Sequence, residues 1–358
     1  MYGLYGSCED GIPGVTPIYL TRTMQTWTRK ILVVLVVAVV VLILLLQLQS
    51  QPITLEVACC RISDGFTLEQ LCAANGSIKI SEIAKLAEDK GCTCLHFFYC
   101  RLVVVTAASD DHYAEAQDMI ASVQKFLPNT TLIVYDIGMT PEQNQRLQRY
   151  CNVEVRPFQF EKYPPHTKSL KAYAWKPLAI QEVASRYEVI FWGDASIRQK
   201  GPYFANKIFP FLLKFPFVAG SVTDLPIISL THDGMLKYLN LSLSREQMSH
   251  FGHLESGCWA VWVNTLMKTK FLNYWADCAL HQECIAPHGA TLLNCDLKTA
   301  MKKTGVYVGC HRYDQSALDM ILIREFGLGV WDSIVHRKSL SQFDVNRQVT
   351  HDFTVKEC

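Results

Sequence analysis

The stretch "YEVIFWGDASIR", residues 187 to 198, decides the fold class of this chain. Its first half is apolar without interruption from Val189 to Trp192, which is typical of a strand that is buried on both faces of a sheet. The strand ends in Gly193 and a carboxylate, Asp194. Because α/β sheets bind ligands at the carboxyl ends of their strands, Asp194 is the first candidate site residue.

Strands and helices alternate around this stretch. Strands are predicted at 101–109, 131–138, 152–160 and 188–193, and helices at 111–127, 141–151 and 176–187. In the less regular second half, strands are predicted at 215–222 and 255–264 and helices at 264–280 and 313–327. The alternation predicts an α/β fold, a Rossmann-like and mainly parallel sheet with helices on both faces. Asp136, which ends the strand "LIVYDIG", would then share one rim with Asp194.

A membrane segment precedes this region. Residues 31–46, "ILVVLVVAVVVLILLL", are all apolar, and with Gln47 and Leu48 they form a helix of about 27 Å, enough for a thin bilayer. Basic residues stand before the segment, and the next one after it is Arg61, so we expect the N-terminus in the cytosol. The segment therefore predicts an uncleaved, single-pass type II signal anchor. A cleaved signal peptide is the alternative.

Thirteen of the fourteen cysteines follow that segment, which favours disulfides in an oxidising compartment over zinc ligands. Thirteen is odd, so at least one thiol is free or joins a second chain in a disulfide-linked dimer. Glycosylation acceptors stand at Asn75, Asn129 and Asn240. Together these features predict the secretory pathway.

The predicted organisation has five parts. They are a cytosolic tail at 1–30, the anchor at 31–48, a cysteine-bearing luminal stem at 49–100, the α/β domain at 101–340 and a C-terminal tail at 341–358. The 34 basic and 33 acidic residues nearly balance, which argues against a nucleic-acid partner.

The residues after the strand at 188–193 suit a phosphate or metal site. Asp194 and the hydroxyl of Ser196 are oxygen ligands of the kind that Mg²⁺ or Mn²⁺ takes beside a diphosphate. Arg198 offers a guanidinium that can clamp phosphate in place of a metal or beside it. The structural alternatives are a turn aspartate and a solvated loop arginine.

Three further residues are candidates. Glu255, in "HLESGCWAVW", is placed as a base on an acceptor hydroxyl, with an exposed loop carboxylate as the alternative. Asp314, before the helix at 313–327, is a second catalytic candidate, and a plain N-cap is its rival. His336 is a candidate third metal ligand, as are His311 and His351, although a lone histidine is more often structural.

The layout of tail, anchor, stem and α/β domain resembles that of Golgi type II glycosyltransferases, and 102–198 resembles the GT-A type nucleotide-diphospho-sugar transferase domain. More narrowly, "VYDIGMT", "YAWKPLAIQEV" and "FWGDASIR" are similar to a family of invertebrate membrane proteins of unknown function. The resemblance implies that Asp194 and Ser196 take the places of the two acids of an Asp-x-Asp element. Lys176 of the Trp-Lys-Pro motif is a further candidate for binding the donor, as is Asp136 from its place on the predicted rim.

The resemblance further implies a Golgi or endoplasmic reticulum enzyme that moves a sugar from a nucleoside diphosphate, UDP by preference, to a glycan or glycoprotein. Serine at 196 departs from the Asp-x-Asp pattern and puts metal dependence and activity in question. Two rivals therefore stay open. One is an inactive transferase fold that binds glycans or partner proteins, and the other is a cysteine-linked structural membrane protein.

Overall fold

The computed structural model describes residues 101–201, 208–212, 215–220, 222–293, 295–330, 335–336, 343–345 and 354–358. The predicted tail, anchor and stem lie outside these residues, as do Asn75 and His351. In the part that is described, no helix is long and apolar enough to span a membrane.

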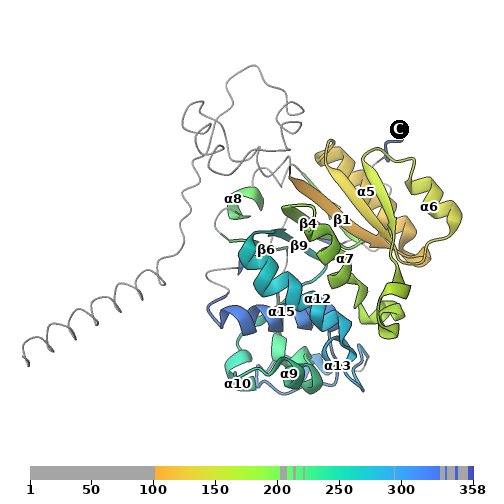
Figure 1. Ribbon diagram of the computed structural model, residues 1–358. Helices are drawn as coiled ribbons and strands as arrows, with labels where there is room; N and C mark the ends of the chain where they lie inside the picture. Colours follow the sequence, from red (N-terminus) through yellow and green to blue (C-terminus); the bar gives the residue numbers. More distant parts are fainter. Residues whose placement is uncertain are drawn as a thin grey trace, which may run out of the picture. The chain divides into compact units, whose positions relative to one another are not determined.

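A seven-stranded sheet forms the centre, in the order β10-β6-β9-β4-β1-β2-β3 (Figure 1). Its strands are β1 (Leu102–Ala108), β2 (Thr131–Asp136), β3 (Val153–Pro157), β4 (Val189–Gly193), β6 (Phe217–Ala219), β9 (Cys258–Trp262) and β10 (Val335–His336). All pairs are parallel except those that β9 makes with β4 and β6. The predicted α/β fold with a mainly parallel sheet is confirmed.

Helices cover both faces of this sheet. The α-helices are α5 (Tyr113–Phe126), α6 (Pro141–Leu147), α7 (Trp175–Ala184), α8 (Phe209–Leu212), α9 (Asp233–Leu239), α10 (Arg245–Met248), α11 (Thr265–Met267), α12 (Asn273–Leu280), α13 (Gln282–Ile285), α14 (Leu297–Ala300) and α15 (Tyr313–Phe326). One core cluster joins α7, α12 and α15 to the sheet, and a second joins α5 to its other face.

Local sequence explains these elements. Every residue of β1 and of β4 is buried, as the apolar runs predict for strands covered on both sides. Thr140 opens α6 through a capping box with Gln143, and Pro141 occupies the first turn. The predicted helix at 264–280 forms as α11 and α12 joined by a π-helical turn, Lys268–Leu272.

The second half holds elements that alternation did not predict. The ribbon β7 (Val222–Pro226) and β8 (Gly252–Leu254) encloses α9 and α10 in sequence. A second ribbon pairs β5 (Ile197–Gln199) with β11 (Phe343–Val345). Long-range pairing of short strands leaves no periodic signal in the sequence.

The last residues are held against the domain. Cys358 forms a disulfide with Cys151, across a sequence separation of 207 residues, and Glu357 pairs with Arg146 at 2.7 Å. The segment from 341 onward therefore contributes a strand and a covalent link, which corrects its description as a tail. Asn129, in a turn, and Asn240, after α9, are both exposed, as glycan acceptors must be.

Seven cysteines lie in the described residues. Six form three disulfides, Cys151–Cys358, Cys278–Cys284 and Cys295–Cys310, and the seventh, Cys258, is a buried free thiol. The predicted use of cysteine for disulfides is confirmed for these six. Among the described cysteines Cys258 is the one outside a disulfide, and its burial makes it unsuited to link a second chain.

The first prediction concerns this pairing. Peptide mapping of the non-reduced chain should recover the three disulfides and find Cys258 modified by iodoacetamide only after unfolding, because the thiol is buried and its pKa is raised. Rapid alkylation of Cys258 in the folded chain, or a mixed disulfide at that residue, would contradict the packing described.

Candidate functional site

The sheet order places the candidate site beside β1. The chain runs from β1 outward through β2 and β3, then returns to β4 on the other side of β1. Such a reversal opens a crevice at the carboxyl ends of the two strands, where ligands of open α/β sheets bind. The loops that follow β1 and β4, residues 109–112 and 194–196, both lie at this point.

Asp194 is held at the end of β4 by three contacts. Its backbone N–H donates to the carbonyl of Gly257 at 2.8 Å. Its Oδ1 accepts from the indole Nε1 of Trp192 at 2.8 Å and from Nζ of Lys176 at 3.1 Å. The side chain is nevertheless 39% exposed, so Asp194 is both oriented by the protein and accessible to a ligand.

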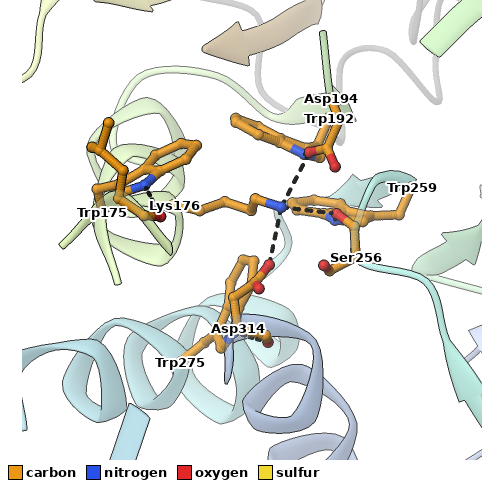
Figure 2. Close-up of polar contacts among 9 residues, drawn as sticks. Trp175, Lys176, Trp192, Asp194, Ser256, Trp259, Trp275 and Asp314 are labelled. Carbon is orange, nitrogen blue, oxygen red and sulfur yellow. Dashed lines mark hydrogen bonds and ion pairs between the residues drawn. The ribbon is translucent and has the colours of Figure 1, made fainter. Parts of the chain in front are cut away.

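Lys176 is the centre of the site (Figure 2). It stands in the first turn of α7 and is 1% exposed, and its Nζ lies 2.9 Å from Oδ2 of Asp314 and 3.5 Å from the carbonyl of Ser256. The rings of Tyr173 and Trp192 lie 5.4 and 5.2 Å from the ammonium. Burial by itself would lower the pKa of Lys176, but the two carboxylates outweigh it and the pKa is raised. We call Lys176, Asp194 and Asp314 the lysine triad.

Asp314 belongs to this triad and is not a simple cap. The residue before α15 is Arg312, and Asp314 lies within the first turn with its side chain 5% exposed. Tyr313 before it has a φ of 41°, which is strained for a residue with a side chain. The N-cap interpretation of Asp314 is therefore wrong, and its burial against Lys176 makes it a poor partner for direct contact with substrate.

The loop 255–257 forms the other wall of the site. Glu255 is partly exposed, and burial, followed by the carboxylates of Asp194 and Glu255, raises the pKa of Cys258 well above its ordinary value. Both carboxylates therefore lie close to Cys258. A Cβ on Gly257 would come within 2.8 Å of Asp194 Oδ2, so only glycine lets the loop approach this closely.

A buried contact between a histidine and an aspartate holds the start of this loop. His253, on β8, contacts Oδ2 of Asp319, on α15, and both side chains are 0% exposed. The same oxygen accepts the N–H of Leu254 at 3.2 Å. Burial raises the pKa of Asp319 to about 6, and His253 opposes that rise. The loop is therefore tied to α15 on one side and to Lys176 on the other.

Asp136 shares the predicted rim but has another task. It ends β2, on the far side of β1 from Asp194, and its Oδ1 accepts N–H groups of Gly138 and Met139 while Oδ2 accepts from Asn144. It lines a shallow hollow of about 540 Å³ over α6 with Met139, Pro141, Glu142, Asn144, Gln145 and Gln148. Asp136 therefore stabilises the turn after β2 and is not part of the site around Lys176.

Arg198 is neither a solvated loop residue nor placed as a phosphate clamp. It is 4% exposed, and its guanidinium donates to the carbonyl oxygens of Ala195 and Ile197 and lies 3.6 Å from Asp118 of α5. This corrects both interpretations of Arg198. Ser196 is also largely buried, at 7%.

The histidine candidates lie elsewhere. The backbone of His336 is on β10, three strand positions from β4, which corresponds to about 14 Å, so its position does not support a shared metal site. His311 is fully buried, and its Nδ1 accepts the N–H of His232 while Nε2 faces the carbonyl of Ile285. With both nitrogens engaged, His311 is not a metal ligand.

One part of the site was missed in the sequence. Ser109, Asp110, Asp111 and His112 follow β1 at the crevice. Ser109 donates a hydrogen bond to the Asp111 carboxylate, and His112 forms a second one. The two hydrogen bonds lower the pKa of Asp111, the one from Ser109 more than the one from His112. Asp110 accepts from Gln143 of α6 at 2.7 Å. The sequence signal for this part of the site is the run of polar residues that directly follows the first buried strand.

A divalent cation fits this site only as a companion of a ligand. No group of three or more metal-binding side chains occurs among the described residues. However, two carboxylates, Asp194 and Asp314, face one ammonium, and Glu255 lies close to Cys258 in the adjoining loop, which leaves an excess of negative charge. An ion that keeps phosphate and water ligands needs one or two protein oxygens, and the accessible carboxylate of Asp194 suits that smaller role.

A protein-family model described as "Protein of unknown function (DUF1647)" matches residues 98–181, which is less than half of the chain. The search of curated proteins gave no match.

Among solved structures, the chain is similar to galactosyltransferase LgtC in complex with donor and acceptor sugar analogs, with 12% sequence identity and a TM-score of 0.35. The alignment covers 60% of this chain and 69% of LgtC. Core-mannan synthase A from Aspergillus fumigatus in a Mn/GDP form is 10% identical, with a TM-score of 0.40 and coverages of 66% and 72%. Mouse xyloside xylosyltransferase 1 is 11% identical, with a TM-score of 0.38 and coverages of 66% and 84%. At these scores, the likenesses decide neither family nor function.

The second prediction tests the lysine triad. Replacing Lys176 with Met should lower the free energy of unfolding by about 3–5 kcal/mol, because two carboxylates lose their buried counter-charge. Urea denaturation of the purified chain measures this. Lys171→Met, an exposed lysine on the approach to the same helix, is the matched control and should change stability by less than about 0.5 kcal/mol. Equal effects of the two changes would contradict the triad.

The third prediction concerns His311. Burial lowers its pKa from 6.5 to about 3, so below pH 6.5 the unfolded chain binds a proton that the folded chain does not. This group should therefore remove about 1.4 kcal/mol of stability per pH unit as pH falls through that window. His311→Gln should flatten the slope of unfolding free energy between pH 6.5 and pH 5 by that amount, and His288→Gln, an exposed control, should not. An unchanged slope in His311→Gln would mean that His311 binds a proton in the folded chain as readily as in the unfolded chain, which would contradict the effect of its burial.

Proposed function

We propose that this chain is a glycosyltransferase that binds a nucleoside diphosphate sugar, preferably a UDP sugar, in the crevice between the carboxyl ends of β1 and β4. The observation that carries the proposal is Asp194, a partly exposed carboxylate held by Lys176 and Trp192 at the topological switch point. The resemblance of "FWGDASIR" to an Asp-x-Asp element supports the same assignment.

The charge of the site decides how a diphosphate can be held. Lys176 is buried and already shared between two carboxylates, so it cannot neutralise a pyrophosphate by contact. Arg198 is turned into the core. A negative ligand beside Asp194 and Glu255 therefore needs a cation that comes with it, Mg²⁺ or Mn²⁺, which would offset the charge that grows on the leaving group.

Each remaining residue then has a role. Asp194 and Ser196 would hold the cation and the diphosphate, and Lys176 would fix the orientation of Asp194 without touching the donor. Glu255, the more accessible of the two catalytic candidates, would take the proton from an acceptor hydroxyl. Asp314 is reassigned as the residue that positions Lys176.

The location of the enzyme in the cell is a further part of the proposed function. We propose that the enzyme is a single-pass type II protein of the Golgi or endoplasmic reticulum membrane, anchored by residues 31–48, with a glycan or glycoprotein as acceptor. The three described disulfides and the exposed sites at Asn129 and Asn240 support a luminal catalytic domain.

A second candidate function is a transferase fold without activity that binds glycans or partner proteins. One observation favours it: Lys176 and Trp192 occupy one of the two carboxylate oxygens of Asp194. This leaves the other oxygen as the available ligand, and residue 196 is serine. The two functions differ in whether a donor sugar is consumed.

The fourth prediction separates them. The melting temperature of the full-length chain should rise with UDP sugars in the presence of Mn²⁺, and much less after chelation. Asp194→Asn should slow donor hydrolysis or transfer by roughly a hundredfold, since a charge beside the leaving group is lost. Asp224→Asn, an exposed aspartate of β7, is the control and should behave as the natural chain.

Gly257→Ala gives an independent variant, because the added methyl group displaces the Asp194 carboxylate without changing charge. It should weaken the response to UDP sugar and Mn²⁺. Binding without turnover in the natural chain would support the second candidate. Turnover that is unchanged in Asp194→Asn would rule out the role given to this residue.

A further inference from the structure

The loop that carries Asp194 is fixed at its far end by strand β5. The N–H of Ile197, the first residue of β5, donates to the carbonyl of Asp194 at 2.8 Å. Arg198 donates to the carbonyl of Ala195 and lies 3.6 Å from Asp118 of α5. Strand β5 therefore determines where this loop lies, and whatever holds β5 also holds the loop.

Strand β11 is the pairing partner of β5. The two strands are antiparallel, with Asp344 opposite Arg198 and Val345 opposite Ile197. Because β11 has only three residues, its pairing is marginal by itself in water. The pairing therefore depends on how firmly the chain beside β11 is held.

The end of the chain that follows β11 is attached firmly to the domain. Cys358 forms a disulfide with Cys151, and its N–H donates to the carbonyl of Arg149 at 3.0 Å. The N–H of Cys151 donates to the carbonyl of Lys356 at 2.9 Å. The side chain of Gln124 accepts the N–H of Lys356 at 2.8 Å and donates to its carbonyl at 3.0 Å. Chain termini are poorly ordered unless they are tied down, so these contacts indicate a structural task for this one.

Helix α5 connects the attached terminus with β5. Its Ser122 accepts the N–H of Gln199 in β5 at 3.2 Å, and its Gln124 holds the C-terminus, which lies beside α5 (Figure 1). A covalent link of eight residues, 346–353, joins β11 to the attached end. A short tether keeps β11 at a high effective concentration beside β5, and release of the attached end lowers that concentration.

The three described disulfides differ in their accessibility. Cys278 and Cys284 are 1% and 0% exposed. Cys310 is also 0% exposed, and its partner Cys295 is half-buried. Cys358, in contrast, is exposed. Because exposed disulfides are the ones most open to thiol exchange, the attachment at Cys358 can open while the other two disulfides stay closed.

We propose that the attached C-terminus positions the loop at Asp194 through β11 and β5, and that a dithiol reductant releases it by opening the Cys151–Cys358 disulfide. A thiolate of the reductant attacks Sγ of Cys358, which forms a mixed disulfide and frees the sulfur of Cys151. The second thiol of the reductant then displaces Cys358. Two electrons and two protons pass to the chain, and the reductant becomes a disulfide.

The expected consequence of release is weaker binding of UDP with Mn²⁺, because the carboxylate of Asp194 is then less well placed. This consequence rests on the proposed function. The positioning of the loop does not, since it concerns the chain without any ligand.

Hydrogen exchange of the full-length chain without ligand tests the positioning. In Cys358→Ser, the amides of 195–199 should exchange faster by roughly fivefold or more, since β5 loses part of its support. Exchange in β1 should stay unchanged and shows that the sheet is intact. Cys295→Ser is the matched control, because it also opens one disulfide at its more accessible cysteine and leaves a buried thiol. It should leave exchange at 195–199 unchanged.

The natural chain provides the same test without a substitution. With increasing dithiothreitol and iodoacetamide, Cys151 and Cys358 should be alkylated before the other four disulfide cysteines. Exchange at 195–199 should rise at that step, and in a sample without iodoacetamide it should return to its first value on reoxidation.

Three results would overturn the proposal. They are unchanged exchange at 195–199 once the Cys151–Cys358 disulfide is open, equal acceleration in Cys295→Ser, and earlier reduction of another disulfide. The affinity for UDP with Mn²⁺, measured on the same variants, should fall by roughly tenfold in Cys358→Ser alone. Faster exchange with an unchanged affinity would refute the effect on the donor. Faster exchange in a chain that binds no UDP would support the positioning and refute the proposed function.

Discussion

The ammonium of Lys176, buried between Asp194 and Asp314, is the interaction on which the site depends. It joins α7 to the end of β4 and to the first turn of α15, elements that are far apart in the chain. It also reaches the carbonyl of Ser256, which belongs to the loop beside Asp194. A single side chain therefore sets the relative positions of Asp194 and Asp314 (Figure 2).

The lysine triad also constrains what the site can bind. Burying an ammonium is tolerable only with close counter-charges, and both carboxylates near Lys176 are used for that purpose. One carboxylate oxygen of Asp194 remains for a ligand, with Glu255 close by and no accessible cation from Arg198. A diphosphate bound beside these carboxylates would therefore need a divalent metal to offset the like charges.

Much of the fold could be predicted from the sequence because apolar runs and helical periodicity are local signals. The strands around Asp194 and Asp136 and the helix that contains Asp314 all formed where predicted. Arg198 was misplaced because its partner, Asp118, lies on a helix eighty positions earlier and nothing in the spacing links the two. The link from Cys151 to Cys358 and the ribbon of β5 with β11 were missed for the same reason.

For the candidate site, the sequence predicted which strand end carries it, but the roles of several residues changed once their contacts were known. Asp194 stands at the predicted strand end, but Asp136 is taken up by its own turn, and Lys176 gained its central place only from three-dimensional contacts. A motif gives residue types in order, whereas the division between ligand-binding and supporting residues depends on burial. Asp314 shows this most clearly, since its exposure of 5% changes its role from catalytic to supporting.

Titration of Mn²⁺ followed by electron paramagnetic resonance tests the central claim most directly. The free Mn²⁺ signal should fall when the natural chain and UDP are added together, and by clearly more than with UDP alone or with the chain alone. In Asp194→Asn this additional loss should be absent. An equal loss of signal in the natural chain and in Asp194→Asn would contradict the account, because the cation would then be held elsewhere.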